Sequence, residues 1–290
     1  GVPLGMLLGF MGGGLIAATY GWRTGFFVAA VPGVLLTVLL LTIREPVRGA
    51  ADAQESGADA VSAVVTEPAP SLVESLRFMW GQASLVRIVV ASVLVTATSS
   101  AMMSWIGSLL IRTHQLSLPQ VGVMTALCMG GFGAVGTLLA GRLADRLGEQ
   151  DMAWQPKLMA LAALLIGVFG VAVCLLPAVA GVAVALALFA ACVAGLNGPT
   201  YALTQSLVKV RMRGVSMSTL IVLLNLIGVG VGPTLAGVLS DAFAAQYGPD
   251  SVRWAMVCVL VLNLPAVALF AWAAREIRSD LARAEARGAA

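Results

Sequence analysis

The chain is poor in charge. Only 11% of its 290 residues are Asp, Glu, Lys or Arg, whereas a soluble domain carries about a quarter. Hydrophobic residues make up 59%, and the mean hydropathy is +0.95. This composition excludes a water-soluble enzyme and also a disordered chain, because disorder requires few apolar residues. The net charge of +3 comes without any basic run, so we expect no nucleic-acid partner.

Residues that carry chemistry are scarce as well. There is one histidine, His114, and the four cysteines lie singly in apolar runs without a C-x-x-C pair, which predicts reduced packing residues. The sequence lacks GxxxxGK[ST], H-E-x-x-H and G-x-S-x-G. Catalysis needs a positioned acid, base or metal. We therefore expect no catalytic residue, no cofactor and no metal, and an intramembrane enzyme has no support.

Long apolar runs are abundant. A membrane-spanning helix needs about 20 mostly apolar residues. The runs are continuous, whereas strands of a membrane barrel alternate apolar and polar residues. The sequence predicts an all-α polytopic membrane protein with eight transmembrane helices, at residues 2–19, 24–43, 85–111, 119–140, 157–176, 179–206, 215–239 and 254–274.

Basic residues divide unequally between the two ends of these helices. If residues 44–84 are cytoplasmic, 14 of the 17 Lys and Arg lie on that side, and only Arg23, Arg112 and Arg253 lie outside. Because cytoplasmic loops are rich in Lys and Arg, we expect the 44–84 loop and the 276–290 tail to be cytoplasmic. The 15 Arg against 2 Lys, with heavy use of Ala, indicate a GC-rich bacterium and hence an inner membrane.

The chain has one long polar segment, between the second and third spans. Near its end, Ser71 and Glu74 form an S-x-x-E capping box. This box predicts a short helix in the membrane interface, and the alternative is an ordinary beginning of the 85–111 helix. The chain opens with an apolar run and no initiator Met, so we expect a part upstream of Gly1.

Polar side chains are concentrated in three of the spans. A polar group in a membrane faces a cavity or a partner helix, so we expect 85–111, 179–206 and 215–239 to line a route, and 157–176 and 254–274 to face lipid. The alternative is hydrogen bonding between helices. No charged residue lies mid-span, which argues against a proton relay within this chain. The substrate-cavity candidates are Thr96, Ser99, Met103, Asn197, Tyr201 and Asn225.

Helix breakers lie inside several spans. A proline in a helix removes a backbone hydrogen bond and permits bending. The helix-hinge candidates are Pro32, Gly33, Pro199 and Pro233.

A charged motif follows the 119–140 span. It is Gly-Arg-Leu-Ala-Asp-Arg-Leu-Gly at residues 141–148, and we predict a short loop in which the two glycines turn the chain. An acid between two arginines suits a latch that pairs and releases as helices move. The conformational-latch candidates are Gly141, Arg142, Asp145, Arg146 and Gly148.

This motif resembles the G-x-L-A-D-R-x-G loop of the major facilitator superfamily, with Glu149-Gln150 in place of the usual basic pair. The resemblance implies that the chain corresponds to helices five to twelve of a twelve-helix transporter. Residues 1–43 would then be the last two helices of a truncated N-terminal bundle, 44–84 the inter-bundle loop, 85–275 the C-terminal six-helix bundle and 276–290 the tail.

A narrower set of short motifs is similar to the spinster-like branch of that superfamily. They are Gly21-Trp22-Arg23, Arg44-Glu45-Pro46-x-Arg48-Gly49, Leu110-Ile111-Arg112-Thr113-His114, and Gly230-Val231-Gly232-Pro233 with Leu239-Ser240-Asp241 and Tyr247-Gly248-Pro249. The coupling acid and substrate-binding arginine proposed for that branch lie in its first four helices, so neither is carried over.

The resemblance implies a secondary active transporter of a small amphiphilic or lipid-like solute, working by alternating access and coupled to an ion. Its partners would be membrane lipid, the small-molecule substrate and the missing N-terminal helices. Two alternatives remain open. One is transport of a polar solute such as a sugar acid or a drug, and the other is a structural membrane fragment that transports nothing.

Overall fold

A computed structural model describes residues 2–42 and 71–288, and in these ranges the chain is all-helical, without a strand. The all-α class predicted from the sequence is confirmed. The N-terminal elements are α1 (Val2–Tyr20), α2 (Trp22–Thr42), α5 (Leu72–Trp80) and α6 (Ala83–His114). The middle elements are α7 (Leu118–Thr125), η1 (Ala126–Phe132), α8 (Gly133–Gln150), α9 (Trp154–Leu175) and α10 (Val179–Ser206). The last are η2 (Val210–Met212), α11 (Arg213–Leu223), η3 (Leu224–Val229), α12 (Gly230–Tyr247), η4 (Gly248–Asp250), α13 (Ser251–Leu260) and α14 (Asn263–Gly288).

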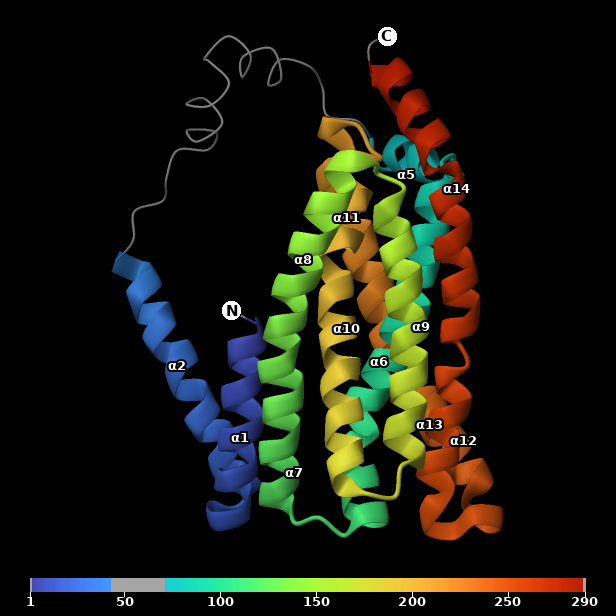
Figure 1. Cartoon of the computed structure of the whole chain (residues 1–290). Coiled ribbons are helices and arrows are strands. Elements are labelled where there is room, and N and C mark those ends of the chain that lie inside the picture. The colour runs from blue at the N-terminus through green and yellow to red at the C-terminus, as the bar shows by residue number, and fades with distance from the viewer. Residues whose placement is uncertain (1, 43–70, 289–290) are drawn as a thin grey trace.

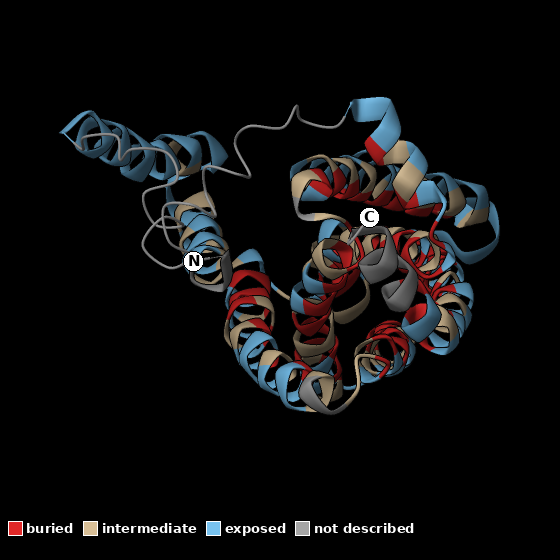
Figure 2. Cartoon of the chain, turned by 90° about the horizontal axis from the view of Figure 1, so that it is seen from above, coloured by how far each residue is buried: buried red, intermediate tan, exposed pale blue. Residues whose placement is uncertain are grey.

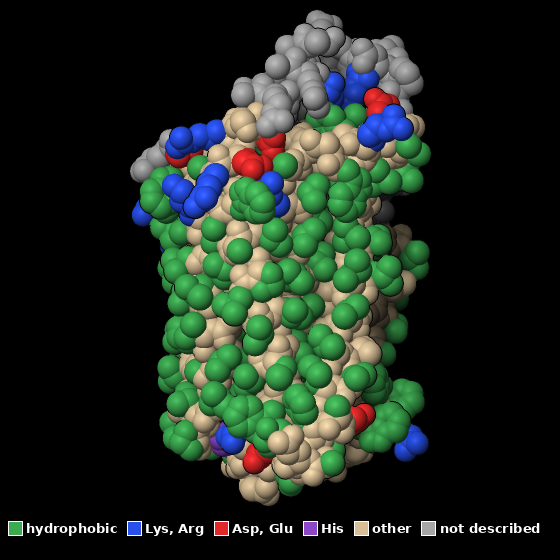
Figure 3. Space-filling model, turned by 90° about the vertical axis from the view of Figure 1, so that its right-hand side faces the viewer, with side chains coloured by type: hydrophobic (Ala, Val, Ile, Leu, Met, Phe, Trp, Pro, Cys, Tyr) green, Lys and Arg blue, Asp and Glu red, His purple; other side chains and the backbone are tan. Residues whose placement is uncertain are grey.

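Six helical segments of the described chain are long and apolar enough to cross a membrane. One of them, Arg213–Asp280, contains two of the predicted spans, 215–239 and 254–274, and the apolar helix Gly5–Tyr20 is slightly shorter than the rest. On the face that Figure 3 shows, hydrophobic side chains cover the middle, whereas charged side chains gather at the two ends. The chain is an integral, multi-pass membrane protein.

The helices from α6 onward form one bundle (Figure 1). Within it, α10 packs on α8 and α9, α14 packs on α6 and α9, and α12 packs on α6 and α13. Seen from above, buried residues face the interior of this bundle (Figure 2). Its core holds large side chains that are fully enclosed, among them Ile88, Met102, Leu186, Phe189 and Phe270.

Helices α1 and α2 stand beside the bundle (Figure 1) and meet it through α1, which packs against α7 and η1. A single residue, Gly21, joins the two helices with φ +83°. Glycine adopts this left-handed conformation without a steric penalty, and so permits a one-residue turn. No residue of α2 is buried.

Helix α5 is a separate short helix. The Ser71 hydroxyl accepts a hydrogen bond from the Glu74 N–H at 3.1 Å, as the capping box predicts. The helix ends at Trp80 and α6 begins at Ala83. A short helix is thus confirmed against the alternative of a continuous one, while its position in the membrane interface stays a prediction. The Arg44-to-Gly49 motif and most of the 44–84 loop lie outside the described residues.

The predicted loop at residues 141–148 is wrong. Helix α8 continues through both glycines to Gln150, and neither glycine has a positive φ. Most of the residues between the glycines favour a helix. The chain turns instead at Asp151, whose carboxylate accepts a hydrogen bond from the Ala153 N–H at 3.0 Å, a geometry that favours a turn over a helix.

The predicted 254–274 helix is interrupted. Helix α13 ends at Leu260, Val261 and Leu262 form a turn, and α14 begins at Asn263, with Pro265 as its third residue. Proline has no N–H to donate to the preceding turn, which accounts for a break at this point. Helix α14 then continues past the predicted end of the bundle, to Gly288.

Candidate functional site

The polar side of α6 faces α10 and η3. Ser92 Oγ lies 3.4 Å from Thr200 Oγ1, which in turn donates to the Leu196 carbonyl at 2.8 Å. Ser100 Oγ donates to the Gly228 carbonyl of η3 at 3.1 Å. These hydroxyls connect helices, so for Ser92 and Ser100 the interhelical alternative holds.

Three predicted cavity residues lie on α6. Thr96 packs against η3, where a Cβ built on Gly228 would lie 2.8 Å from the Thr96 side chain. The Ser99 hydroxyl is buried and has no hydrogen-bond partner among the described groups, whereas Met103 is 37% exposed. A buried polar group without a partner is unfavourable. The role of Ser99, Thr96 and Met103 in binding a solute stays a prediction.

The other three predicted cavity residues are distributed over α10 and η3. Asn197 is exposed on α10, and Tyr201 is half-buried against the core. Asn225 is exposed on η3 and donates to the carbonyl of Ile221, four residues earlier in α11, at 2.9 Å. No hydrogen bond in the described part of the chain joins these three residues, and none of them lines a cavity found there. Their role in a substrate cavity stays a prediction.

Two π-helical segments, η1 and η3, interrupt the predicted spans 119–140 and 215–239. Each lies at a close contact between helices. A Cβ on Gly130 of η1 would lie 2.6 Å from the Leu7 backbone N of α1, and Gly228 of η3 meets Thr96. Such wide turns are frequent at functional sites. They are not predicted from the sequence, although η1 contains Gly130 and Gly131 and η3 contains Gly228.

The hinge candidates differ in their surroundings. Helices α2 and α10 run without interruption past Pro32-Gly33 and Pro199, respectively. Pro233 lies four residues after Val229, the last residue of η3, so the carbonyl of Val229 lacks its usual helical donor. The Pro233 carbonyl accepts a hydrogen bond from Trp105 Nε1 at 3.0 Å. The π-helical segment η3 and the missing backbone hydrogen bond at the Val229 carbonyl thus lie within one turn of Pro233. Hinge motion at any of these residues stays a prediction.

Glycines bring α1 and α7 into backbone contact. A Cβ built on Gly122 would lie 3.1 Å from the Cα of Gly14 and 3.0 Å from the Phe10 carbonyl oxygen. Larger residues would hold the two helices apart, because side chains would fill this space. This contact connects residues 2–42 to the bundle that follows.

The latch candidates lie at the end of α8. Arg142, Asp145 and Arg146 are exposed, and no ion pair among the described side chains includes them. Gly141 has open space around it, whereas a Cβ on Gly148 would lie 2.7 Å from the Gln155 Nε2. The latch role of these five residues stays a prediction.

The ion pair next to that motif joins α14 to the turn before α9. Asp151 pairs with Arg278, whose Nε donates to Asp151 Oδ1 at 3.2 Å. This hydrogen bond, with a second from the Ala153 N–H, lowers the pKa of the Asp151 carboxyl to about 2. Asp151 therefore stays ionised at every physiological pH.

Further polar contacts connect α6 to α14 near the same end. The Ser84 N–H at the start of α6 donates to Asp280 Oδ2 at 2.8 Å, which places an anion at a helix N-terminus. Arg87 pairs with Glu276, and its guanidinium lies 4.1 Å from the Trp272 ring centroid. Deeper in the bundle, Thr98 Oγ1 donates to Asn263 Oδ1 at 3.2 Å. These bonds attach α14 to the core and leave the opposite side of α6 to α10 and η3.

Comparisons with known proteins agree with this fold. The profile of the Major Facilitator Superfamily matches residues 1–228. The chain is 28% identical over 281 residues to an MFS-type efflux pump of Mycolicibacterium smegmatis. The aligned region covers 97% of this chain and 62% of the pump. The chain thus spans less than two thirds of the length of this curated relative.

Two solved structures are also similar. Both are crystal structures of a bacterial homolog to the human lysosomal transporter Spinster in an inward-facing conformation. The unoccupied form matches with a TM-score of 0.70 at 22% identity, over 96% of this chain and 65% of that one. The occupied form matches with a TM-score of 0.68 at 22% identity, over 90% and 59%. The resemblance to the spinster-like branch is thereby confirmed at the level of the fold.

The bundle and its apolar spans define a polytopic α-helical membrane protein. The match over more than half of the sequence is specific, and the chain belongs to the Major Facilitator Superfamily.

Proposed function

We propose that this chain is the greater part of a secondary active transporter that moves a small amphiphilic or lipid-like solute by alternating access, coupled to an ion. The observation that carries the proposal is the contact of α1 with α7 and η1 through Gly14, Gly122 and Gly130. Close contact through small residues allows two groups of helices to separate and meet again without repacking large side chains.

The solute route that we propose lies along α6, α10 and η3. The buried, unpartnered hydroxyl of Ser99 and the exposed amides of Asn197 and Asn225 supply donors and acceptors, and Met103 supplies apolar surface. A mixed lining of this kind suits an amphiphile. The exposed faces of α1 and α2 support the further proposal that helices encoded upstream complete the cavity.

Export of a drug-like solute is the second candidate. It is favoured by the likeness to a relative described as an efflux pump. The orientation that we propose places α5, the end of α8 and the C-terminus in the cytoplasm of a bacterium, in its inner membrane, because 14 of the 17 basic residues then lie inside.

Uptake into vesicles tests the proposal. The complete protein with its upstream helices is reconstituted, and the flux of a fluorescent lysolipid, a sugar acid and a cationic dye is measured. We expect lysolipid flux above that of empty vesicles, and a reduction of about tenfold for Asn197→Leu and Asn225→Leu, which corresponds to about 1.4 kcal/mol of lost solute binding. Thr137→Val on α8, outside the polar face, is the matched control and should transport normally.

Each outcome of this assay has a defined meaning. Flux of the dye without lysolipid flux would replace the amphiphile with a drug. No flux for any of the three solutes would leave the structural alternative. Normal flux in both asparagine variants would remove these residues from the route while leaving transport itself intact.

A further inference from the structure

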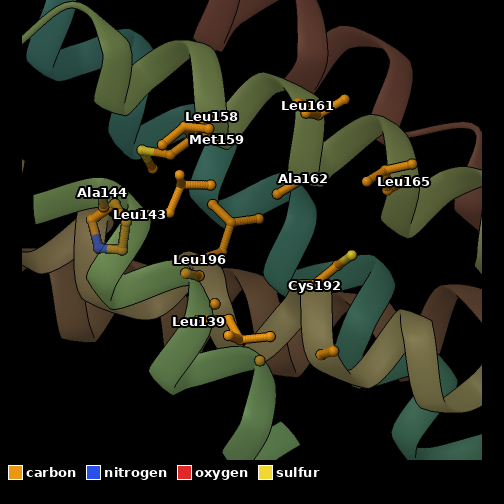
Figure 4. A pocket seen from close by; sticks show the side chains of 15 residues that line it. Leu139, Leu143, Ala144, Leu158, Met159, Leu161, Ala162, Leu165, Cys192 and Leu196 are labelled. Atoms are coloured by element: carbon orange, nitrogen blue, oxygen red, sulfur yellow. The ribbon is translucent and has the colours of Figure 1, made fainter. Parts of the chain in front are cut away.

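A groove runs along the outer face of the bundle, with α8 and α9 as its walls and α10 as its floor (Figure 4). Its volume is about 270 Å³. The lining contains only Gly, Ala, Leu, Met, Cys and Pro, so the surface of the groove is apolar. The predicted cavity residues are not among them, so the groove is separate from the proposed solute route.

Small residues make the floor deep. Gly136 and Gly195 allow α8 and α10 to touch: a Cβ on Gly195 would lie 2.6 Å from the Ala140 Cβ, and one on Gly136 would overlap the Ala191 backbone. The walls are tall by comparison, since Leu139 is 61% and Leu161 is 52% exposed. The groove therefore opens sideways, toward the surroundings of the bundle.

Basic side chains stand at one end of both walls. On α8, Leu139, Leu143 and Arg146 follow at i, i+4 and i+7, and on α9 Lys157 is one turn before Leu161, so each cation shares a face with a wall leucine. Arg146 and Lys157 are both exposed. The Lys157 ammonium lies 4.5 Å from the Trp154 ring centroid, and tryptophan favours the headgroup level of a membrane.

We propose that this groove binds an anionic glycerophospholipid, with one acyl chain along α10 and the phosphate between Arg146 and Lys157. Acyl chains are as apolar as the leucine walls, so the groove alone does not select one lipid from the bilayer. The selection comes from the net negative headgroup, whose phosphate pairs with Arg and Lys and has no ammonium group of its own to neutralise it. Asp151 pairs with Arg278, and its carboxylate also attracts Lys157, so a phosphate bound at Lys157 shares that cation with Asp151. This proposal does not depend on the transported solute.

Photo-crosslinking tests the site with the purified chain in phosphatidylcholine vesicles. Two probes carry the same diazirine-labelled acyl chains: a phosphatidylglycerol, and a diacylglycerol that has no phosphate. Labelled peptides are identified by mass spectrometry. We expect phosphatidylglycerol to label the groove segments of α8, α9 and α10 more strongly than the exposed α2, and diacylglycerol to label all of them equally.

Variants separate the two parts of the site. Cys192→Phe fills the groove and should reduce its labelling, whereas Leu164→Phe, on α9 outside the lining, should not. Lys157→Gln should lower phosphatidylglycerol labelling about threefold, as expected for a partly exposed ion pair, and leave diacylglycerol labelling unchanged. Arg23→Gln, near the turn between α1 and α2, is its control. Equal labelling of the groove and α2 by phosphatidylglycerol in the unmodified chain, or equal groove labelling by both probes, would overturn the proposal.

Discussion

Hydrogen bonds between single polar side chains connect the helices of this bundle. Asn263 is 1% exposed and accepts from Thr98, so the one polar residue at the centre of the predicted 254–274 span faces the core rather than lipid. The expectation that this span faces lipid is therefore wrong for the side that carries Asn263, because a lone amide in hydrocarbon is unfavourable. The identity of the partner depends on the rotation of α14 about its axis, which apolar neighbours of similar size do not specify.

The ion pair between Asp151 and Arg278 gives a residue-level prediction about pH. The folded pKa of Asp151 is lowered to about 2 from its ordinary value of 3.8. The stabilisation is therefore complete above pH 3.8 and is lost as the pH falls through about 2. The melting temperature of the chain in detergent should exceed that of Asp151→Asn by a constant amount from pH 7 to 4, and the difference should shrink below that.

Arg278→Gln should remove the same pH-dependent difference, because it removes the same partner. A difference between the chain and Asp151→Asn that stays constant down to pH 2 would contradict the lowered pKa of Asp151, because the Arg278 and Ala153 hydrogen bonds both favour its ionised form.

Whole helices are the part of the structure that the sequence predicts best. Spans such as 157–176 and 179–206 agree with α9 and α10 within about three residues, because long continuous apolar runs have no other stable form in a bilayer. Wide turns and breaks are predicted less well. Gly141 and Gly148 remain helical, and so does Gly136 although it meets another helix as closely as Gly130 of η1 does, so neither glycine nor a close contact by itself identifies a wide turn.

Glycines at helix contacts yield a prediction at this scale. Gly136→Ala should destabilise the bundle by about 1–3 kcal/mol, since the added methyl overlaps the Ala191 backbone, which cannot move without shifting α10. Gly198→Ala is the matched control: its Cβ would meet open space on α10, and alanine favours a helix by up to about 1 kcal/mol. Thermal unfolding in detergent measures both. Equal melting temperatures for the two variants would contradict the close contact of α8 and α10.

The whole molecule has two parts that the sequence distinguishes only by resemblance. Composition and charge predict a multi-pass membrane protein, and the motif at 141–148 identifies the superfamily. The pairing of α1 with α7 and η1 is not visible in the sequence, because glycine is dense in several spans and its spacing does not name a partner helix. The sequence likewise does not show how the cavity candidates lie relative to one another. In the structure Asn197 and Asn225 are exposed on different helices.

The contact between the two parts can be tested with the chain as it is. A protease site placed within residues 43–70 separates α1–α2 from the rest of the chain after purification. We expect the two pieces to stay together in mild detergent, since Gly14 and Gly122 pack backbone to backbone. Gly14→Leu should release α1–α2, because its side chain enters that contact. Gly9→Leu, whose Cβ meets open space in this chain, should not. Co-purification of both pieces in the Gly14→Leu variant would mean that surfaces other than this glycine contact hold α1 to the bundle. It would contradict the proposal that two groups of helices separate at this contact during transport.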